Sequence, residues 1–368
     1  MTETALRPVP QPGILRIAPY VPGKSQAVPG VVPVKLSANE SPLGASPRAI
    51  AAYQAQAGRL ETYPEGSSKI LREALGDVHG LDPERILCGG GSDEVLHLLA
   101  QTYLGEGDEA VMSRYGFNVY PIVTRGASAE IVMAPESDYR ADVDALLAAV
   151  TDRTRLVFLA NPNNPTGTYL SAAELERLHG GLRPDVLLVV DSAYAEYVTA
   201  ADYSVGIDLV DRADNVVMVR TFSKMGLAAL RIGWMYGPAH VIDAVNRIRG
   251  PFNVSLPAQH AGAEAARDRG FTAELCRHNA RWRDWLTRSI RSNRLRVVDS
   301  QANFVMVLFP DPAEAKAAFG ALLEKGLIVR EIHGYGIAEG LRISIGREEH
   351  MRGVVEVLEA FGAAGAAD

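Results

Sequence analysis

The sequence has few cysteines, few aromatic residues and no excess of positive charge. Its 368 residues include two cysteines, Cys88 and Cys276, and no CxxC pair. Neither a disulfide framework nor a thiolate zinc site is therefore expected. Aromatic residues make up 7%, and 37 Lys plus Arg stand against 44 Asp plus Glu, which gives a net charge of −7. This balance predicts that the chain does not bind nucleic acid.

Long apolar runs are also missing. The strongest, residues 156–160 and 186–190, are far shorter than the roughly 20 residues that cross a bilayer as a helix. The N-terminus is rich in proline and lacks the apolar stretch of a signal peptide. The sequence contains no HExxH motif, so a metal centre is not expected. We therefore expect a cytoplasmic protein with no membrane partner and no metal.

Apolar patterning divides the chain into three segments. Residues 1–30 are rich in proline and poorly periodic, which is typical of an extended N-terminal arm. Residues 31–250 alternate helices with short apolar strands, a pattern that predicts a large domain with a mostly parallel sheet flanked by helices. Residues 251–368 predict a smaller α+β domain. The expected fold class is α/β.

Polar clusters follow four of the predicted strands. Strands are predicted at 85–88, 110–112, 131–133, 156–160, 186–190, 216–219, 232–236, 303–308 and 340–345, and helices at 93–104, 172–179, 258–291 and 312–325. The clusters are GGGSDE at 89–94, NPNNPTG at 161–167, DSAY at 191–194 and TFSK at 221–224. Parallel α/β sheets bind ligands at the carboxyl ends of their strands. The four clusters therefore predict a single site at that edge.

Each cluster also has a simpler structural interpretation. GGGSDE is either an anion site at a helix N-terminus or only a strand-to-helix turn, and it matches neither the dinucleotide fingerprint nor the P-loop. Asn164 either presents a rigid amide or merely forms an X-Pro turn. Asp191 either pairs with a buried cation or caps the next helix. Lys224 is either a Schiff-base lysine with a lowered pKa or an ordinary surface lysine.

Together, the four clusters predict a pyridoxal phosphate site. The phosphate of this cofactor needs backbone N–H groups, hydroxyls and an arginine, and its pyridine nitrogen needs a carboxylate. Its ring oxygen needs hydrogen-bond donors, and its aldehyde needs a lysine. The clusters supply the backbone N–H groups, hydroxyls, carboxylate, amide and lysine at successive strand ends, and Arg231 follows Lys224 by seven residues. An α/β-hydrolase is not expected, because no GxSxG motif occurs.

The order GGGSDE, NPNNPTG, DSAY, TFSK and GLAALR resembles that of the fold-type I aminotransferases. Within them, four further segments are similar to those of the histidinol-phosphate aminotransferases: APYVPGK (18–24), SANESPLGASP (37–47), TYPEGSS (62–68) and LRISIGREEH (341–350). The resemblance covers about residues 20–357. It implies a homodimer with shared active sites that acts in histidine biosynthesis. The implied reaction interconverts L-histidinol phosphate plus 2-oxoglutarate and imidazole-acetol phosphate plus L-glutamate, with pyridoxal 5'-phosphate as cofactor.

The resemblance also implies which residues bind the cofactor. Lys224 would bond to its aldehyde and then act as acid and base. Asp191 would pair with the pyridine nitrogen, while Asn164 and Tyr194 would bind the ring oxygen. The phosphate would be held by Ser92, Asp93, Thr221, Ser223 and Arg231, and across the subunit boundary by Tyr63.

The ring-stacking aromatic and the substrate site complete the implied assignments. Phe117 would stack on the cofactor ring, with Tyr115 as its competitor. The substrate would be bound by Tyr20, Asn39, Asn164 and Arg342, of which Arg342 takes the anionic end.

This chain departs from the family pattern in two places. The segment between Lys224 and Arg231 is one residue shorter than in the common SKxxGLAGLR pattern, and DSAY replaces DEAY. Other activities remain open: an aromatic amino acid aminotransferase, an enzyme that accepts both substrate types, or a decarboxylase of a phosphorylated amino acid. A cofactor-sensing DNA-binding regulator is disfavoured, because an arm of 30 residues is too short for a DNA-binding domain.

Overall fold

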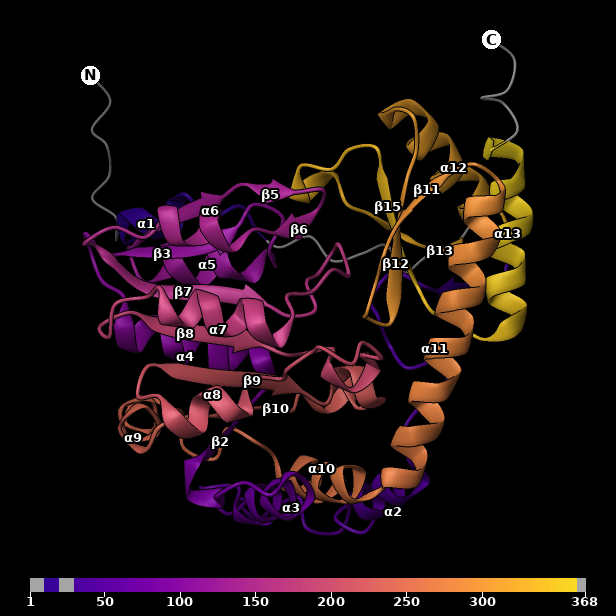
Figure 1. Ribbon diagram of the computed structural model, residues 1–368. Coiled ribbons are helices and arrows are strands. Elements are labelled where there is room, and N and C mark those ends of the chain that lie inside the picture. Colours follow the sequence, from indigo (N-terminus) through magenta and orange to yellow (C-terminus); the bar gives the residue numbers. More distant parts are fainter. Residues whose placement is uncertain (1–9, 20–29, 363–368) are drawn as a thin grey trace, which may run out of the picture.

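The computed structural model describes residues 10–19 and 30–362, and a seven-stranded sheet forms its larger part (Figure 1). The strand order is β2 (Ile86–Gly89), β10 (Gly233–Tyr236), β9 (Val216–Thr221), β8 (Leu187–Asp191), β7 (Thr154–Ala160), β3 (Glu109–Ser113) and β4 (Glu130–Ala134). Of these seven strands, β10 alone runs in the opposite direction to the other six. The expected α/β fold with a mostly parallel sheet is confirmed.

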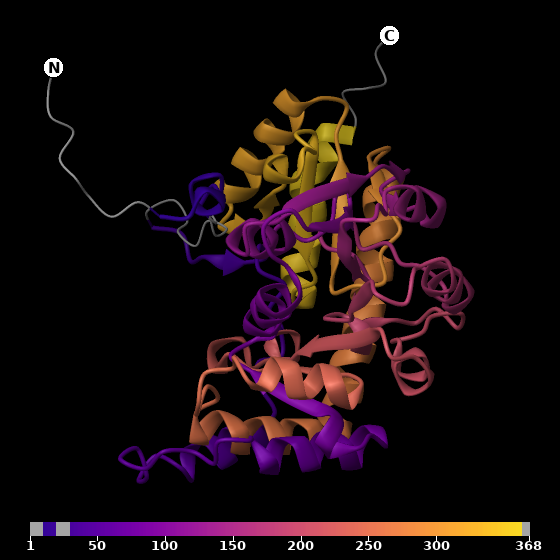
Figure 2. The same cartoon turned by 90° about the vertical axis from the view of Figure 1, so that its left-hand side faces the viewer.

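Both faces of this larger sheet are buried, which explains why its central strands are apolar at every position. Along β7, Leu156 and Phe158 pack on one face, whereas Val157 and Leu159 pack on the other. The first face is covered by α4 (Ser92–Tyr103), α5 (Val119–Gly126) and α9 (Ala239–Asn246). Helices that pack on the second face are α2 (Pro47–Gln54), α3 (Lys69–His79), α6 (Val143–Ala148), α7 (Ala172–Gly180), α8 (Ile207–Arg212) and α10 (Leu256–Arg267). In the turned view, α10 lies against α2 and α3 at the base of the molecule (Figure 2).

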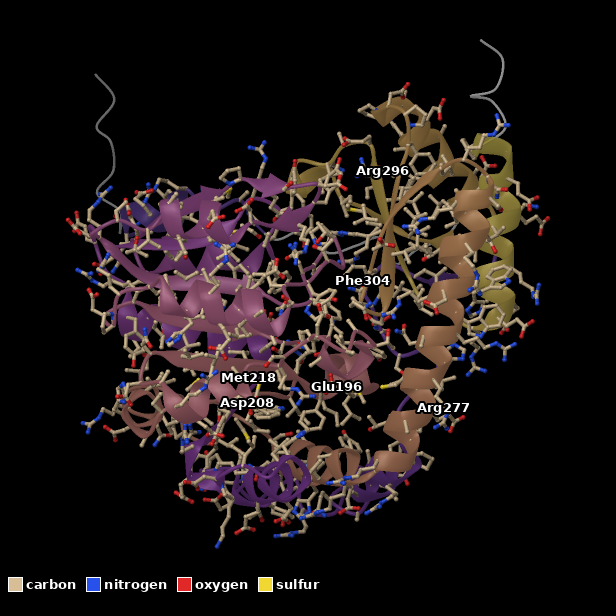
Figure 3. All side chains as sticks on the ribbon, viewed as in Figure 1. Glu196, Asp208, Met218, Arg277, Arg296 and Phe304 are labelled. Atoms are coloured by element: carbon tan, nitrogen blue, oxygen red, sulfur yellow. The ribbon has the colours of Figure 1, made fainter. Side chains whose placement is uncertain are left out.

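A smaller antiparallel sheet stands beside the larger one. Its strand order is β11 (Arg296–Val298), β12 (Phe304–Leu308), β15 (Gly340–Ser344) and β14 (Arg330–Glu331). One face packs on α11 (Arg269–Ser292), α12 (Pro312–Glu324) and α13 (Glu348–Gly362). From the other face, Phe304 lies between the two sheets (Figure 3), where its ring contacts the ring of Tyr194 at 5.2 Å.

The segment before α2 crosses between the sheets. Its strand β1 (Val34–Lys35) pairs in parallel with β13 (Leu327–Ile328), next to the smaller sheet. This pairing places residues 37–40 between the two sheets, where they line a pocket. A hairpin of β5 (Glu136–Ser137) and β6 (Arg140–Ala141) also approaches the smaller sheet, through an ion pair between Asp138 and Arg296.

The N-terminal arm is not wholly extended, contrary to expectation. It contains α1 (Pro12–Leu15), in which proline takes the first helical position, where its fixed φ suits a helix. Gly13 sits so close to the Arg125 carbonyl that a side chain there would clash. Residues 1–9 and 20–29 of the arm lie outside the described residues.

The boundary expected at residue 250 remains a prediction. The helix that follows it, α10, buries Ala258, Ala261 and Ala265 in the core of the larger sheet, and α11 then leads to the smaller sheet (Figure 1). Short 3₁₀ turns occur at η1 (Pro83–Arg85), η2 (Ala195–Tyr197), η3 (Ser223–Met225), η4 (Ala228–Leu230) and η5 (His333–Tyr335). Over residues 10–19 and 30–362, no helix has the length and apolar character needed to cross a membrane.

Candidate active site

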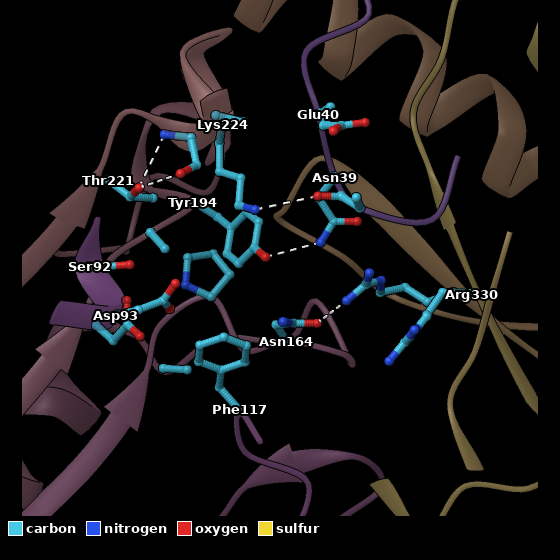
Figure 4. A pocket seen from close by; sticks show the side chains of 18 of the residues that line it. Asn39, Glu40, Ser92, Asp93, Phe117, Asn164, Tyr194, Thr221, Lys224 and Arg330 are labelled. Atoms are coloured by element: carbon cyan, nitrogen blue, oxygen red, sulfur yellow. Dashed lines mark hydrogen bonds between the residues drawn. The ribbon is translucent and has the colours of Figure 1, made fainter. Parts of the chain in front are cut away.

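One pocket at the carboxyl ends of the larger sheet's strands collects those predicted site residues that the structure describes, except Tyr63 (Figure 4). Those that line it are Asn39, Ser92, Asp93, Phe117, Asn164, Asp191, Tyr194, Thr221, Ser223, Lys224, Arg231 and Arg342. Strands β8 and β9 end at Asp191 and Thr221, which places these side chains at the predicted edge. Tyr20 lies outside the described residues. The four sequence clusters therefore do converge on a single site.

Asp191 is a buried carboxylate, and one of its two oxygens accepts no hydrogen bond from the described residues. Its Oδ2 accepts a hydrogen bond from the Tyr120 hydroxyl at 2.8 Å, whereas its buried Oδ1 has no partner among the described residues. Burial raises the pKa of Asp191 to about 6. An unpaired carboxylate oxygen in a pocket requires a donor, and the N–H of a protonated pyridine ring is a suitable one. Tyr120, which holds the other oxygen, was not predicted.

Lys224 lies in the pocket rather than on the surface. Its Nζ is 3.5 Å from the carbonyl oxygen of Ala38 and 5.7 Å from the centre of the Tyr194 ring. Burial, reinforced by the nearby Arg342 guanidinium, lowers the pKa of Lys224 to about 8. The Tyr197 hydroxyl donates to the Lys224 carbonyl oxygen at 2.5 Å and so fixes the backbone of η3. A lysine held in this way has more neutral, nucleophilic amine near pH 7 than an ordinary lysine.

An anion cradle forms where the glycine-rich turn enters α4. The Thr221 hydroxyl donates to Ser223 Oγ at 3.0 Å, and Arg231 Nη1 donates to the same oxygen at 3.3 Å. Arg231 Nη2 donates to Asp93 Oδ2 at 2.9 Å. Gly91 has a φ of +93°, and a Cβ there would lie 2.4 Å from Arg231 Nη2, so glycine is what lets the guanidinium approach. Hydroxyls, a guanidinium and a helix N-terminus together suit a phosphate.

The shape of this turn is fixed by two residues that were not predicted. The Glu94 carboxylate accepts hydrogen bonds from the Gly90 backbone N–H and from Asn253 Nδ2, the latter at 2.8 Å. Asn253 Nδ2 also donates to the Cys88 carbonyl oxygen at 3.2 Å. The turn therefore keeps its form through contacts within the protein. The shortened segment before Arg231 does not prevent that guanidinium from reaching Ser223.

Of the two aromatic candidates, Phe117 lines the pocket and Tyr115 does not. The Phe117 ring meets the Tyr120 ring edge to face at 5.8 Å. Tyr115 instead packs against Tyr139, with ring centres 5.5 Å apart. Phe117 is therefore the aromatic side chain placed to cover a ring bound in the pocket.

Two arginines from neighbouring strands of the smaller sheet face the larger one. Arg342 on β15 is buried, and its Nη2 donates to the Ser37 carbonyl oxygen at 2.6 Å, while its Nη1 donates to Asn164 Oδ1. Its Nε has no partner within the described part of the chain. Arg330 on β14 is paired in register with Arg342 and also lines the pocket (Figure 4). Two guanidiniums at one end of the pocket suit a strongly anionic ligand.

Arg330 is one of several pocket residues that sequence reasoning missed. The others are Lys35, Ser37, Ala38, Glu40, Ala160, Pro162, Ala193, Ala228 and Tyr335. Residues 37–40 belong to the segment SANES, which is one of the segments that carry the family resemblance. Lys35 is a second lysine in the pocket lining, and it forms an ion pair with Glu40 at 2.9 Å.

Tyr63 lies apart from the pocket on an exposed apolar surface. Its side chain is 78% exposed and stacks on Phe252, with ring centres 4.8 Å apart. Tyr53 and Leu60, also exposed, belong to the same surface depression. Such a patch is typical of a surface that a partner covers.

The residues present fit pyridoxal phosphate. The orphaned Asp191 oxygen, the Arg231 cradle and the buried Lys224 amine match the ring nitrogen, phosphate and aldehyde of that cofactor. No group of three or more His, Cys, Asp or Glu side chains within residues 10–19 and 30–362 could hold a metal ion.

Comparison with known proteins agrees with this chemistry. The model of the aminotransferase class I and II family matches residues 32–358. Histidinol-phosphate aminotransferases of Rhodopseudomonas palustris (strain BisB18) and Rhodospirillum rubrum are 55% and 53% identical to this chain, covering 96% and 97% of it and 98% of each relative. The crystal structure of histidinol-phosphate aminotransferase from Sinorhizobium meliloti in complex with pyridoxal 5'-phosphate is 29% identical. It has a TM-score of 0.84 and covers 90% of this chain and 91% of that one.

Proposed function

The chain belongs to the class I and II aminotransferases, and from that premise we propose that it transfers an amino group between L-histidinol phosphate and 2-oxoglutarate. The products are imidazole-acetol phosphate and L-glutamate, and the cofactor is pyridoxal 5'-phosphate. The observation that carries the proposal is the pocket that joins Lys224, the unpaired Asp191 oxygen and two arginines. Relatives that are more than half identical and carry this activity support it.

The cofactor site divides into three parts. Arg231, Ser223 and the N-terminus of α4 would hold the phosphate, and Asp191 would hold the ring nitrogen in its protonated form. Asn164 Oδ1 is occupied by Arg342, so its amide Nδ2 remains to donate into the pocket. When bound, pyridoxal phosphate supplies an electron-withdrawing ring that stabilises negative charge on the substrate carbon that loses its proton.

Lys224 has two tasks. Its amine would hold the cofactor covalently, which a lowered pKa favours, because only the neutral amine is a nucleophile. Once released by the incoming amino donor, the same amine would take the proton from the substrate carbon. It would then deliver this proton to the cofactor carbon C4′, which is bonded to the same nitrogen. Phe117 and Tyr194 line the pocket around this space. The two half-reactions predict ping-pong kinetics.

The arginine pair provides substrate recognition. Histidinol phosphate carries a phosphate and no carboxylate, whereas glutamate carries two carboxylates, so one site must accept both kinds of oxyanion in turn. A guanidinium can do this, because its planar fork matches either group with two hydrogen bonds. Arg342 is already oriented by Asn164 and Ser37, and Arg330 adds a second positive charge.

The active unit is a homodimer in which Tyr63 reaches the phosphate in the partner's pocket. The exposure of Tyr63 and Phe252 supports this assignment, because two stacked aromatic rings are costly to leave in water. The same exposed surface continues to Tyr53 and Leu60. Covering it with a second copy would bury all four side chains.

A comparison of amino donors tests the proposal. The purified protein, supplied with pyridoxal phosphate and 2-oxoglutarate, should turn over L-histidinol phosphate with a far higher kcat/KM than phenylalanine. The measured product should be glutamate in stoichiometric amount. Preference for phenylalanine, or release of carbon dioxide from a phosphorylated amino acid, would overturn the assigned reaction.

A further inference from the structure

A buried chain of hydrogen bonds joins the smaller sheet to Tyr194. The backbone N–H of Asn39 donates to Ser344 Oγ at 2.9 Å, and the Ser344 hydroxyl donates back to Asn39 Oδ1 at 2.9 Å. Asn39 Nδ2 donates to the Tyr194 hydroxyl oxygen at 3.0 Å (Figure 4). All three side chains are buried. We call this chain of contacts the Ser344 relay.

Asn39 is held in its place from two sides. Its φ of +57° is in the left-handed region, which asparagine tolerates better than most residues with a side chain. Ser344 on β15 holds its amide, and Asn303 Nδ2 donates to its carbonyl oxygen at 3.0 Å. The orientation of the Asn39 side chain is therefore set by the smaller sheet, although its outer end contacts a residue of the larger one.

The relay has a fixed direction. A backbone N–H can only donate, so Ser344 Oγ must accept from Asn39, and the Ser344 proton is then free to point at Asn39 Oδ1. With Oδ1 accepting, the other end of the amide is the donor Nδ2, and the Tyr194 oxygen must accept from it. A hydroxyl that accepts in this way keeps its own proton for a different partner. For Tyr194, the space beyond is the pocket.

We infer that Ser344 and Asn39 are positioning residues that compel Tyr194 to act as a hydrogen-bond donor toward the ring oxygen of the cofactor. The inference rests on the proposed function, because it needs pyridoxal phosphate in the pocket. A donor stabilises the deprotonated form of that oxygen. The relay therefore favours the form of the bound cofactor in which the ring oxygen is an anion.

The relay begins on the strand that also carries Arg342. Arg342 and Ser344 are two residues apart on β15 and so point to the same face of the sheet. Among the described residues, the charged and titratable groups that interact with Tyr194 include Lys224, Arg342, Asp191, Tyr120, Tyr197 and Tyr335, and all of them remain in the variants below.

Reversing the relay is the sharpest test. Asn39→Asp has nearly the same shape but replaces the donor Nδ2 by an acceptor, so Tyr194 would donate to it and not to the cofactor. The readout is the pH midpoint of the visible absorbance of the bound cofactor, measured on the whole cofactor-loaded protein. Loss of one hydrogen bond to an anion should raise this midpoint by about one unit.

A double-mutant cycle separates reversal from the added charge. In the Tyr194→Phe background, Asn39→Asp still adds a negative charge but has no hydroxyl to turn. The relay predicts that Asn39→Asp shifts the midpoint by at least about half a unit more when Tyr194 is present. Equal shifts in both backgrounds would overturn the inference.

Ser344 itself is tested with a matched control. Ser344→Ala should raise the midpoint by a few tenths of a unit, and Ser344→Thr, which keeps the hydroxyl, should restore it. Ser292→Ala, on α11, removes a hydroxyl whose hydrogen bond goes to neighbouring backbone, Ser289 O at 2.7 Å, and should leave the midpoint unchanged. Equal midpoints for Ser344→Ala, Ser292→Ala and the unmodified protein would contradict the role of Ser344.

Failure of the proposed function has a different signature. It would show in the unmodified protein as an absence of bound cofactor, or of turnover of histidinol phosphate. Failure of the relay would leave the unmodified protein active, with a normal absorbance titration, and would appear only in the variants. Should Ser344→Ala not fold, the Asn39→Asp and Tyr194→Phe cycle decides the matter alone.

Discussion

Replacing Arg342 by lysine tests whether one guanidinium serves both substrates. Arg342 is buried and is held by Asn164 and by the Ser37 carbonyl oxygen, at 2.6 Å for the latter. Lysine keeps the charge but has no planar fork, so it cannot hold these partners and grip an oxyanion at two points. Each hydrogen bond to a charged group contributes about 1.5–3 kcal/mol net, and lysine recovers part of that loss.

We expect Arg342→Lys to weaken transition-state binding by about 2–4 kcal/mol for each substrate, which is roughly a 30- to 900-fold loss in kcat/KM. Single-turnover absorbance measurements with glutamate and with histidinol phosphate, each alone, follow the two half-reactions separately. Arg296→Lys is a suitable control, because Arg296 forms an exposed ion pair with Asp138 away from the pocket. That control should stay within about twofold of the unmodified protein.

The reasoning is refuted if only the glutamate half-reaction slows. In that case Arg342 would bind only carboxylates, and other groups would hold the phosphate of histidinol phosphate. Arg330→Lys, measured in the same way, then identifies whether the second guanidinium is the phosphate ligand. Slowing of both halves by Arg342→Lys supports the shared site.

Three further predictions concern Lys224, Asp191 and Tyr63. Capture of pyridoxal phosphate by the cofactor-free protein should speed up about tenfold per pH unit and level off above about pH 8, where the Lys224 amine is neutral; a flat profile in stopped-flow absorbance would contradict this. The folded carboxyl of Asp191 has a pKa raised from 3.8 to about 6, so stability is lost as pH rises through that range. Asp191→Asn should therefore increase the free energy of unfolding of the cofactor-free protein at pH 7 by up to about 3 kcal/mol, which is seen as a higher Tm. Near pH 4 the substitution should leave the Tm unchanged. Tyr63→Phe should weaken cofactor binding by about 1.5–3 kcal/mol through one lost phosphate hydrogen bond; a fully active monomer in sedimentation would exclude the shared site.

The sequence predicted most of the cofactor side of the site because of how parallel sheets are built. Strand ends of such a sheet meet at one edge, so clusters after successive strands were expected to converge, and Asp191, Thr221 and Lys224 do so. Apolar runs such as residues 186–190 were long enough to show strands buried on both faces. The antiparallel direction of β10 was not visible, because an apolar run does not record its direction.

The site residues that were not predicted from the sequence reach the pocket because segments distant in the sequence pack together. Tyr120 lies on α5, and nothing local indicates that its hydroxyl meets Asp191, 71 residues later in the chain. Arg330 enters the pocket only because β14 pairs with β15. The Ser344 relay likewise requires residues 305 positions apart to meet. No strand was predicted at residues 327–331, although the apolar run LIV before Arg330 is typical of one.

The account depends above all on Lys224 being the residue that binds the cofactor. Reduction of the purified, cofactor-loaded protein with borohydride, followed by peptide mapping, should find the adduct on Lys224. Lys35 is the internal comparison, since it also lines the pocket but is paired with Glu40. Lys224→Ala should bind pyridoxal phosphate without forming the adduct and lose transamination by several orders of magnitude, whereas Lys35→Ala should still form it. An adduct on Lys35, or an undiminished adduct in Lys224→Ala, would contradict the account.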